Sequence, residues 1–168
     1  MRPTESAAYG VVVIEHVEVS REIKAPADEV WKALSDVTRM GEWSPVCKAC
    51  WWDDGDSARV GAWFTGRNEQ PERTWETRCE VLAADPGREF TFVVGGAESP
   101  FARWSYTFTP VDGGTELTES WEVMPALVAR FAENFDDGGA AALAERTATA
   151  HSGMAATLAA IKEAAERS

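Results

Sequence analysis

The sequence predicts an α+β fold in which a bent antiparallel sheet of about seven strands wraps around one long C-terminal helix. Large apolar residues recur at every second position in several successive segments, which is typical of half-buried strands. Short turn signals such as Asp85-Pro86-Gly87 separate these segments, which favours an antiparallel meander over βαβ units. The last part of the chain shows helical periodicity instead.

The N-terminal part is predicted to hold one strand and two short helical segments, after a loose tail at residues 1–10. Val11–Lys24 is the first predicted strand, and Pro26 ends it. A short helix is predicted over 26–37, because proline is favourable in the first turn and acidic residues follow it. Residues 40–45 are predicted to form a turn or a single helical turn.

Six further strands are predicted in the middle of the chain, each ended by glycine, proline or aspartate. They span residues 46–52, 59–69, 73–83, 88–94, 102–109 and 115–123.

Helical periodicity returns after Pro125. Leu127–Phe135 is predicted to be a short helix, interrupted by the acidic and glycine-rich run 136–139. Apolar and small residues then recur at spacings of three and four, which predicts one buried face of a long helix. That face carries Leu143, Thr147, Ala150, Met154, Leu158, Ile161 and Ala165. Residues 11–168 are expected to form a single domain.

Composition narrows the function classes. The 168 residues carry a formal charge of −12, which disfavours binding to phosphate backbones, so no nucleic-acid partner is expected. The early apolar run Val11–Ile14 is broken by Glu15 and is too short for a signal peptide or a membrane span. We therefore expect a cytoplasmic protein.

The three cysteines include Cys47 and Cys50 at CxxC spacing, with Cys79 as the third. A metal site would need further ligands, but His16 and His151 are far apart in sequence. Residues three apart in a regular strand point to opposite faces, so we expect buried thiols and neither a metal nor a cofactor. Both histidines are expected at the surface.

A bent sheet rich in aromatic residues around a single helix usually leaves a cavity, although a solid aromatic core is the alternative. The alternation of side chains along the strands places two charged residues, Arg21 and Glu119, on the apolar face. Asn68 and Tyr106 share that face and offer hydrogen bonds to a ligand. The catalytic role is unassigned among these four residues. The predicted ligand-binding set is Arg21, Phe64, Asn68, Trp75, Phe92, Trp104, Tyr106, Phe108, Glu119, Trp121, Met154 and Leu158.

Adjacent Trp51 and Trp52 force one large ring onto the outer face or an edge. Such a ring marks a partner surface or is capped by the chain's own tail, and the sequence leaves both open.

Eight motifs follow one another along the chain: Val19–Trp31, Met40–Pro45, Val60–Asn68, Trp75–Thr77, Pro86–Phe90, Trp104–Tyr106, Gly114–Glu119 and Gly153–Leu158. Together they resemble the polyketide cyclase/dehydrase branch of the SRPBCC superfamily, which contains the START-like and Bet v 1-like proteins. The resemblance covers about Val17–Glu166 and implies the helix-grip fold, in which the first and last strands are neighbours. We therefore expect Arg21 and Glu119 to form a buried ion pair, which either fixes the strand register or contacts the ligand.

Three functions follow from the residues and the resemblance together. The leading one is binding of a hydrophobic small molecule, of polyketide, lipid or aromatic type, between the sheet and the long helix. The first alternative is an aromatase/cyclase-like enzyme that performs aldol closure and dehydration. The second is a protein–protein interaction module. A homodimer is an assembly that the sequence leaves open.

Overall fold

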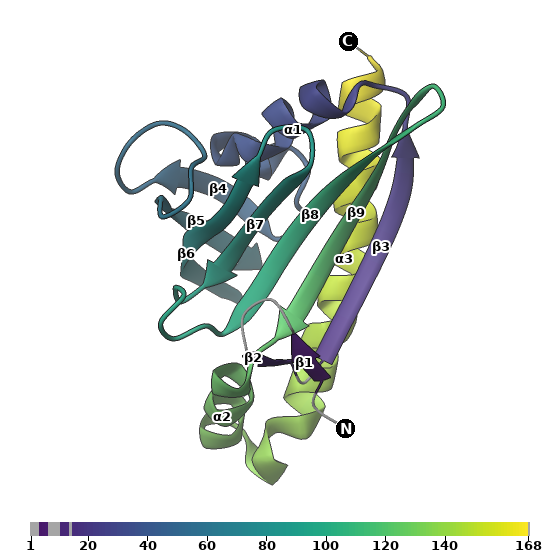
Figure 1. The fold of residues 1–168 in the computed structure, drawn as a ribbon. Helices are drawn as coiled ribbons and strands as arrows, with labels where there is room; N and C mark the ends of the chain where they lie inside the picture. The colour runs from purple at the N-terminus through teal and green to yellow at the C-terminus, as the bar shows by residue number, and fades with distance from the viewer. Residues whose placement is uncertain (1–3, 7–10, 14, 168) are drawn as a thin grey trace.

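The computed structural model describes residues 4–6, 11–13 and 15–167. Within these residues, seven antiparallel strands form the main sheet in the order β3-β9-β8-β7-β6-β5-β4 (Figure 1). The strands are β3 (Glu15–Ile23), β4 (Cys47–Trp52), β5 (Trp63–Gln70), β6 (Arg73–Asp85), β7 (Glu89–Val94), β8 (Ala102–Val111) and β9 (Gly114–Val123).

The predicted first strand is divided in two. Its first residues form β2 (Val11–Val13), which pairs with β1 (Thr4–Ser6) in a separate two-stranded sheet. Residues 15–23 of the predicted strand form β3, which pairs with β9. Of the predicted loose tail, residues 1–3 and 7–10 lie outside the described residues.

Two short helical segments follow β3, as predicted: α1 (Ala27–Ser35) and η1 (Val37–Glu42). The chain ends with α2 (Pro125–Asn134), η2 (Asp136–Gly139) and α3 (Ala140–Glu166). Figure 1 shows α3 running along the sheet beside β3 and β9, with α1 at one end of the molecule and α2 at the other. The predicted α+β architecture, a curved sheet around a long C-terminal helix, is confirmed. No helix among the described residues is long and apolar enough to cross a membrane.

The break between α2 and α3 has a local cause. Asp137 has a φ of 54°, and Gly138 and Gly139 have φ values of 70° and 77°. A Cβ atom on Gly139 would lie 2.4 Å from the carbonyl oxygen of Phe131. Only glycine fits there, so the chain turns sharply and α3 begins with a new direction.

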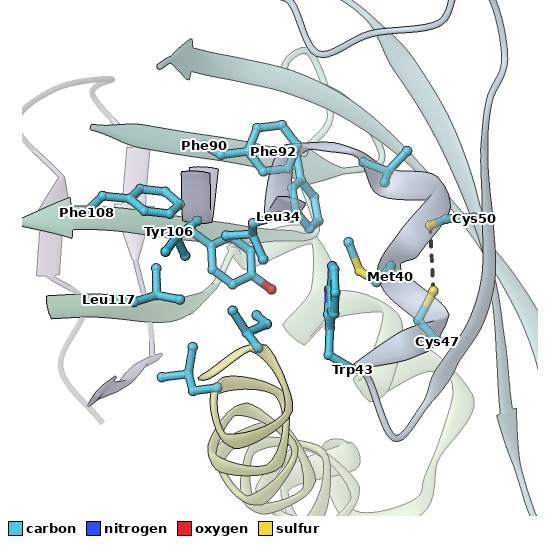
Figure 2. Close-up of a cluster of buried hydrophobic side chains, with 14 of the residues drawn as sticks. Leu34, Met40, Trp43, Cys47, Cys50, Phe90, Phe92, Tyr106, Phe108 and Leu117 are labelled. Atoms are coloured by element: carbon cyan, nitrogen blue, oxygen red, sulfur yellow. Dashed lines mark hydrogen bonds between the residues drawn. The ribbon is translucent and has the colours of Figure 1, made fainter. Parts of the chain in front are cut away.

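One half of the concave interior is filled with side chains, and we call it the packed half. It contains Leu34, Phe90, Phe108, Leu117, Leu158 and Ile161, none of which is more than 4% exposed. Figure 2 shows Phe108 and Leu117 on one side of Tyr106, and Met40, Trp43 and the two cysteines on the other. The predicted buried stripe of α3 faces this interior from Leu143 to Ile161.

Candidate functional site

Beside the packed half lies a cavity of about 120 Å³ between α3, the η1–β4 connection and the inner face of the sheet. Its apolar wall is formed by Met40, Pro45, Val46, Phe64, Trp75, Phe92, Val94, Trp104, Ala150 and Met154. Its other lining residues are Ser44, Cys47, Cys50, Gly66, Asn68, Thr77, Cys79, Tyr106, Glu119, Arg146, Thr149, Gly153 and Thr157.

Small side chains explain why this half of the interior is hollow. On α3, residues 150 and 153 are alanine and glycine, whereas residues 158 and 161 further along are leucine and isoleucine. On the sheet, Gly66 leaves room, and a Cβ atom there would lie 3.2 Å from the sulfur of Cys47. The aromatic rings therefore form the walls of a space that they do not fill.

The cavity has an open end and a closed end. Pro45 is exposed, and Trp75, Arg146 and Thr149 are half-buried, so these residues form its mouth. Tyr106 and Glu119 are only 3% and 2% exposed and form its closed end.

Glu119 is the principal titratable group at the closed end. The Tyr106 hydroxyl donates a hydrogen bond to Oε1 of Glu119 at 2.7 Å. Oε2 is buried and has no hydrogen-bond partner among the described residues. Burial raises the pKa of Glu119 to about 8, although the hydrogen bond from Tyr106 partly opposes that rise.

The pair has a definite chemical capacity. A carboxyl group with a pKa near 8 is populated in both protonation states around neutral pH, so it can give or take a proton. Burial, together with the Glu119 charge, raises the pKa of the Tyr106 phenol well above its usual value, so the phenol stays a hydrogen-bond donor. The closed end can thus donate to a ligand carbonyl or remove a proton beside it.

The predicted ion pair between Arg21 and Glu119 is wrong. The β3–β9 register sets Val19 opposite Glu119 and Arg21 opposite Leu117. Since β3 lies at the edge of the sheet, the side chain of Arg21 is exposed and avoids the cost of desolvation. Arg21 does not line the cavity, and the hydroxyl of Tyr106 contacts Glu119 instead.

Of the other predicted ligand-binding residues, eight line the cavity. They are Phe64, Asn68, Trp75, Phe92, Trp104, Tyr106, Glu119 and Met154. Phe108 and Leu158 belong to the packed half, and Trp121 is buried against Trp104 at a ring-centroid distance of 6.0 Å. The amide of Asn68 donates to Oγ1 of Thr77 at 3.2 Å, so β6 already holds this group.

The two cysteines of the CxxC motif lie on the same face of β4, contrary to the prediction. A β-bulge between Cys47 and Ala49 shifts the register, so that both thiols turn inward and their sulfur atoms lie 3.7 Å apart (Figure 2). Cys79 is buried close by, as the prediction of buried thiols requires.

Arg146 is the functional candidate that the sequence analysis missed. It lies three residues after Leu143 and four before Ala150, so it occupies the same helical face as the predicted stripe. A charged residue on an otherwise apolar helical face was the feature of the sequence that pointed to Arg146. Its guanidinium carbon lies 5.2 Å from the ring centroid of Trp121.

Residues proposed for other roles lie away from the cavity. Trp51 is 41% exposed, whereas Trp52 is half-buried and packs edge-to-face on Phe64 at 5.6 Å. His16 and His151 are exposed, as predicted.

Comparison with known proteins assigns the chain to a family. The family model described as "Polyketide cyclase / dehydrase and lipid transport" matches residues 15–166. No curated protein sequence matches the chain.

Solved structures share the fold. A solution structure of the Polyketide_cyc-like protein Cgl2372 from Corynebacterium glutamicum is 44% identical, covers 90% of this chain and 91% of its own, and has a TM-score of 0.67. The di-domain ARO/CYC protein StfQ from the steffimycin biosynthetic pathway is 16% identical, with a TM-score of 0.68, and the match covers 92% of this chain and 51% of StfQ. Major latex-like protein 151 from Panax ginseng is 16% identical, with a TM-score of 0.54 over 66% of this chain and 78% of its own.

Proposed function

The chain belongs to the polyketide cyclase/dehydrase and lipid transport family, and from that premise we propose that it binds a small apolar molecule in the cavity between α3 and the sheet. The observation that carries this proposal is a mostly apolar cavity that encloses a buried carboxyl–phenol pair at its closed end. Binding sites for small molecules combine apolar walls with a few converging polar groups in this way.

The volume of the cavity limits the size of the ligand that it can enclose. A dry cavity of roughly 150 Å³ holds one benzene ring. The cavity of about 120 Å³ therefore suits one ring or a short alkyl chain, and the rest of a larger ligand would extend through the mouth. An oxygen atom at the inner end of the ligand would accept a hydrogen bond from protonated Glu119.

A matched pair of helix variants tests binding. Gly153→Leu places a large side chain at the cavity wall, where a Cβ atom meets Pro45 at 3.7 Å without a clash. Ala155→Leu adds the same side chain at an exposed position of α3. We expect a solvatochromic dye to gain fluorescence with the wild type and with Ala155→Leu, and to lose about tenfold in affinity with Gly153→Leu. Equal dye binding by all three proteins, or no uptake by any, would contradict the proposal.

A second function is supported by the free Oε2 of Glu119 and its raised pKa. Glu119 would act as the general base or acid of an aldol closure and dehydration, taking a proton from carbon beside a carbonyl and returning one to the leaving oxygen. Tyr106 would hold Glu119 in position and hydrogen-bond to it in its ionised form.

Hydrogen–deuterium exchange of benzoylacetone, a 1,3-diketone with one ring, tests this chemistry without knowledge of the natural substrate. We expect the wild type to accelerate exchange at the carbon between the carbonyls, with a rate that rises through about pH 8 as Glu119 ionises. Glu119→Gln should lower the bound-state rate by roughly 100-fold or more while dye affinity is retained. An unchanged exchange rate in Glu119→Gln would exclude Glu119 as the base.

A further inference from the structure

The mouth of the cavity carries an arginine with unusual surroundings. Arg146 is half-buried, lines the cavity, and lies over the indole ring of Trp121, which is 1% exposed. Among the described residues no carboxylate forms an ion pair with Arg146. Burial and the nearby guanidinium of Arg73 both lower the pKa of Arg146.

Arg73 adds a second cation to this end of the cavity. It lies at the start of β6, with its guanidinium carbon 4.5 Å from the ring centroid of Trp75, and Trp75 lines the cavity. Arg73 is exposed, so solvent screens its charge, but that charge still opposes the positive charge of Arg146. An anion bound beside Arg146 would relieve this repulsion.

Arg103, which is more deeply buried than Arg146, shows the contrast within the same molecule. Arg103 is 8% exposed and forms an ion pair with Glu122 on the neighbouring strand β9. A desolvated guanidinium is thus supplied with a carboxylate there, whereas Arg146 has aromatic and apolar neighbours and an open mouth. The anion that Arg146 lacks within the described residues can enter from solution.

We propose that the ligand is an apolar carboxylic acid, and that its carboxylate binds Arg146 at the cavity mouth while its apolar part occupies the cavity. This inference rests on the proposed binding function and assigns the chemical class of the ligand. The planar guanidinium matches a carboxylate with two parallel hydrogen bonds, and partial burial strengthens them. Arg73 adds attraction at longer range from its exposed position.

Phenylacetate and its methyl ester are the probes, because they share one ring and differ in charge. Their affinities are measured by titration calorimetry or by NMR shifts of the wild-type protein. We expect the acid to bind about tenfold more tightly than the ester, and added salt to reduce that difference.

Substitutions at Arg146 separate charge from packing. Arg146→Gln should abolish the preference for the acid and leave ester affinity within about twofold, and Arg146→Lys should retain part of the preference. Arg130→Gln is the matched control: Arg130 is an exposed arginine whose guanidinium carbon lies 5.3 Å from the ring centroid of Phe101, and its loss changes the net charge equally. The control should leave both affinities unchanged.

The outcomes distinguish the two proposals. Ester and dye binding without any preference for the acid would overturn the carboxylate site and leave the proposed binding function standing. An equal loss of preference in Arg130→Gln would show a general charge effect and also overturn the site. Failure of acid, ester and dye to bind the folded wild type would overturn both proposals.

Discussion

The packed half of the interior and the half that holds the cavity are built on the same strands and the same helix, yet one is solid and the other hollow. β8 contributes Phe108 to the packed half and Tyr106 to the cavity, only two residues apart. β9 contributes Leu117 to the first and Glu119 to the second. Part of the difference lies in the opposing surface: α3 presents Leu158 and Ile161 to the packed half, and Ala150, Gly153 and Thr157 together with Met154 to the cavity.

This comparison separates two roles of large side chains. Where a large residue of the sheet meets a large residue of α3, apolar contact fills the space and stabilises the fold. Where it meets a small residue, the same ring becomes a wall with a surface left for a ligand. The sheet therefore supplies aromatic surface to both halves, and the small residues of α3 leave part of that surface uncovered in the cavity.

The largest expected effect contrasts two adjacent residues of α3. Leu158→Ala in the packed half should lower the free energy of unfolding by about 2–5 kcal/mol, because Leu158 is fully buried and its removal leaves a void. Thr157→Ala, which enlarges an existing cavity, should change it by about 1 kcal/mol or less. Urea denaturation measures both values. Similar losses in the two variants would remove the distinction between the halves.

An intermediate effect concerns pH. Glu119 has a pKa of about 8 in the folded protein, against 4.5 for an ordinary glutamate, so between these pH values the folded state holds one more proton than the unfolded state. Its contribution to stability is complete below about pH 4.5 and is lost as pH rises through about 8, by up to about 1.4 kcal/mol per pH unit.

Denaturation across pH 4 to 9 compares the wild type with Glu119→Gln, which cannot ionise. The variant should show a flatter dependence and should gain stability relative to the wild type as pH rises. Tyr106→Phe removes the donor that favours the carboxylate, so the loss should extend to higher pH in that variant. Parallel curves for wild type and Glu119→Gln would mean that Glu119 ionises normally.

The smallest expected effect concerns the glycine of the hollow half. Gly153→Ala should raise the free energy of unfolding by up to about 1 kcal/mol, because alanine favours the helix and its Cβ atom meets Pro45 at an ordinary 3.7 Å. It should also narrow the mouth and weaken phenylacetate binding. Ser152→Ala, at the exposed neighbouring position, controls for helix propensity outside the cavity and removes only an exposed hydrogen bond from the Ser152 hydroxyl to the Thr149 carbonyl. A gain in stability with unchanged binding would place Gly153 outside the ligand path.

The fold was largely predictable because alternation and turn residues act locally. Phe64, Phe92 and Tyr106 follow a period of two, and the stripe of α3 follows spacings of three and four, so both faces are readable without coordinates. The boundary that failed is at residues 11–15, where one predicted strand serves two sheets. Strand pairing decides that division, because β2 pairs with the nearby β1 and β3 with the distant β9, and periodicity carries no information about pairing partners.

The site was less predictable, for two physical reasons. The alternation of side chains along a strand places Arg21 and Glu119 on the same face of the sheet. It does not indicate that β3 is an edge strand, where a long side chain remains in solvent. Parity also fails where a bulge adds a residue, which is how Cys47 and Cys50 come to share a face. Arg146 was readable from its spacing to Leu143, but its lack of a carboxylate partner within the described residues required coordinates.

Within the described residues, the main sheet does not close on itself, so it has two edge strands, and these affect how the protein behaves at high concentration. Among the described strands, β3 and β4 each pair along one side, so each presents backbone groups with which another chain can form hydrogen bonds. β3 carries exposed Glu18, Arg21 and Glu22, and β4 is bulged and carries exposed Lys48. Charge on one border and irregular backbone on the other both hinder strand-to-strand association. Arg21, which lies outside the cavity, contributes charge to the β3 border.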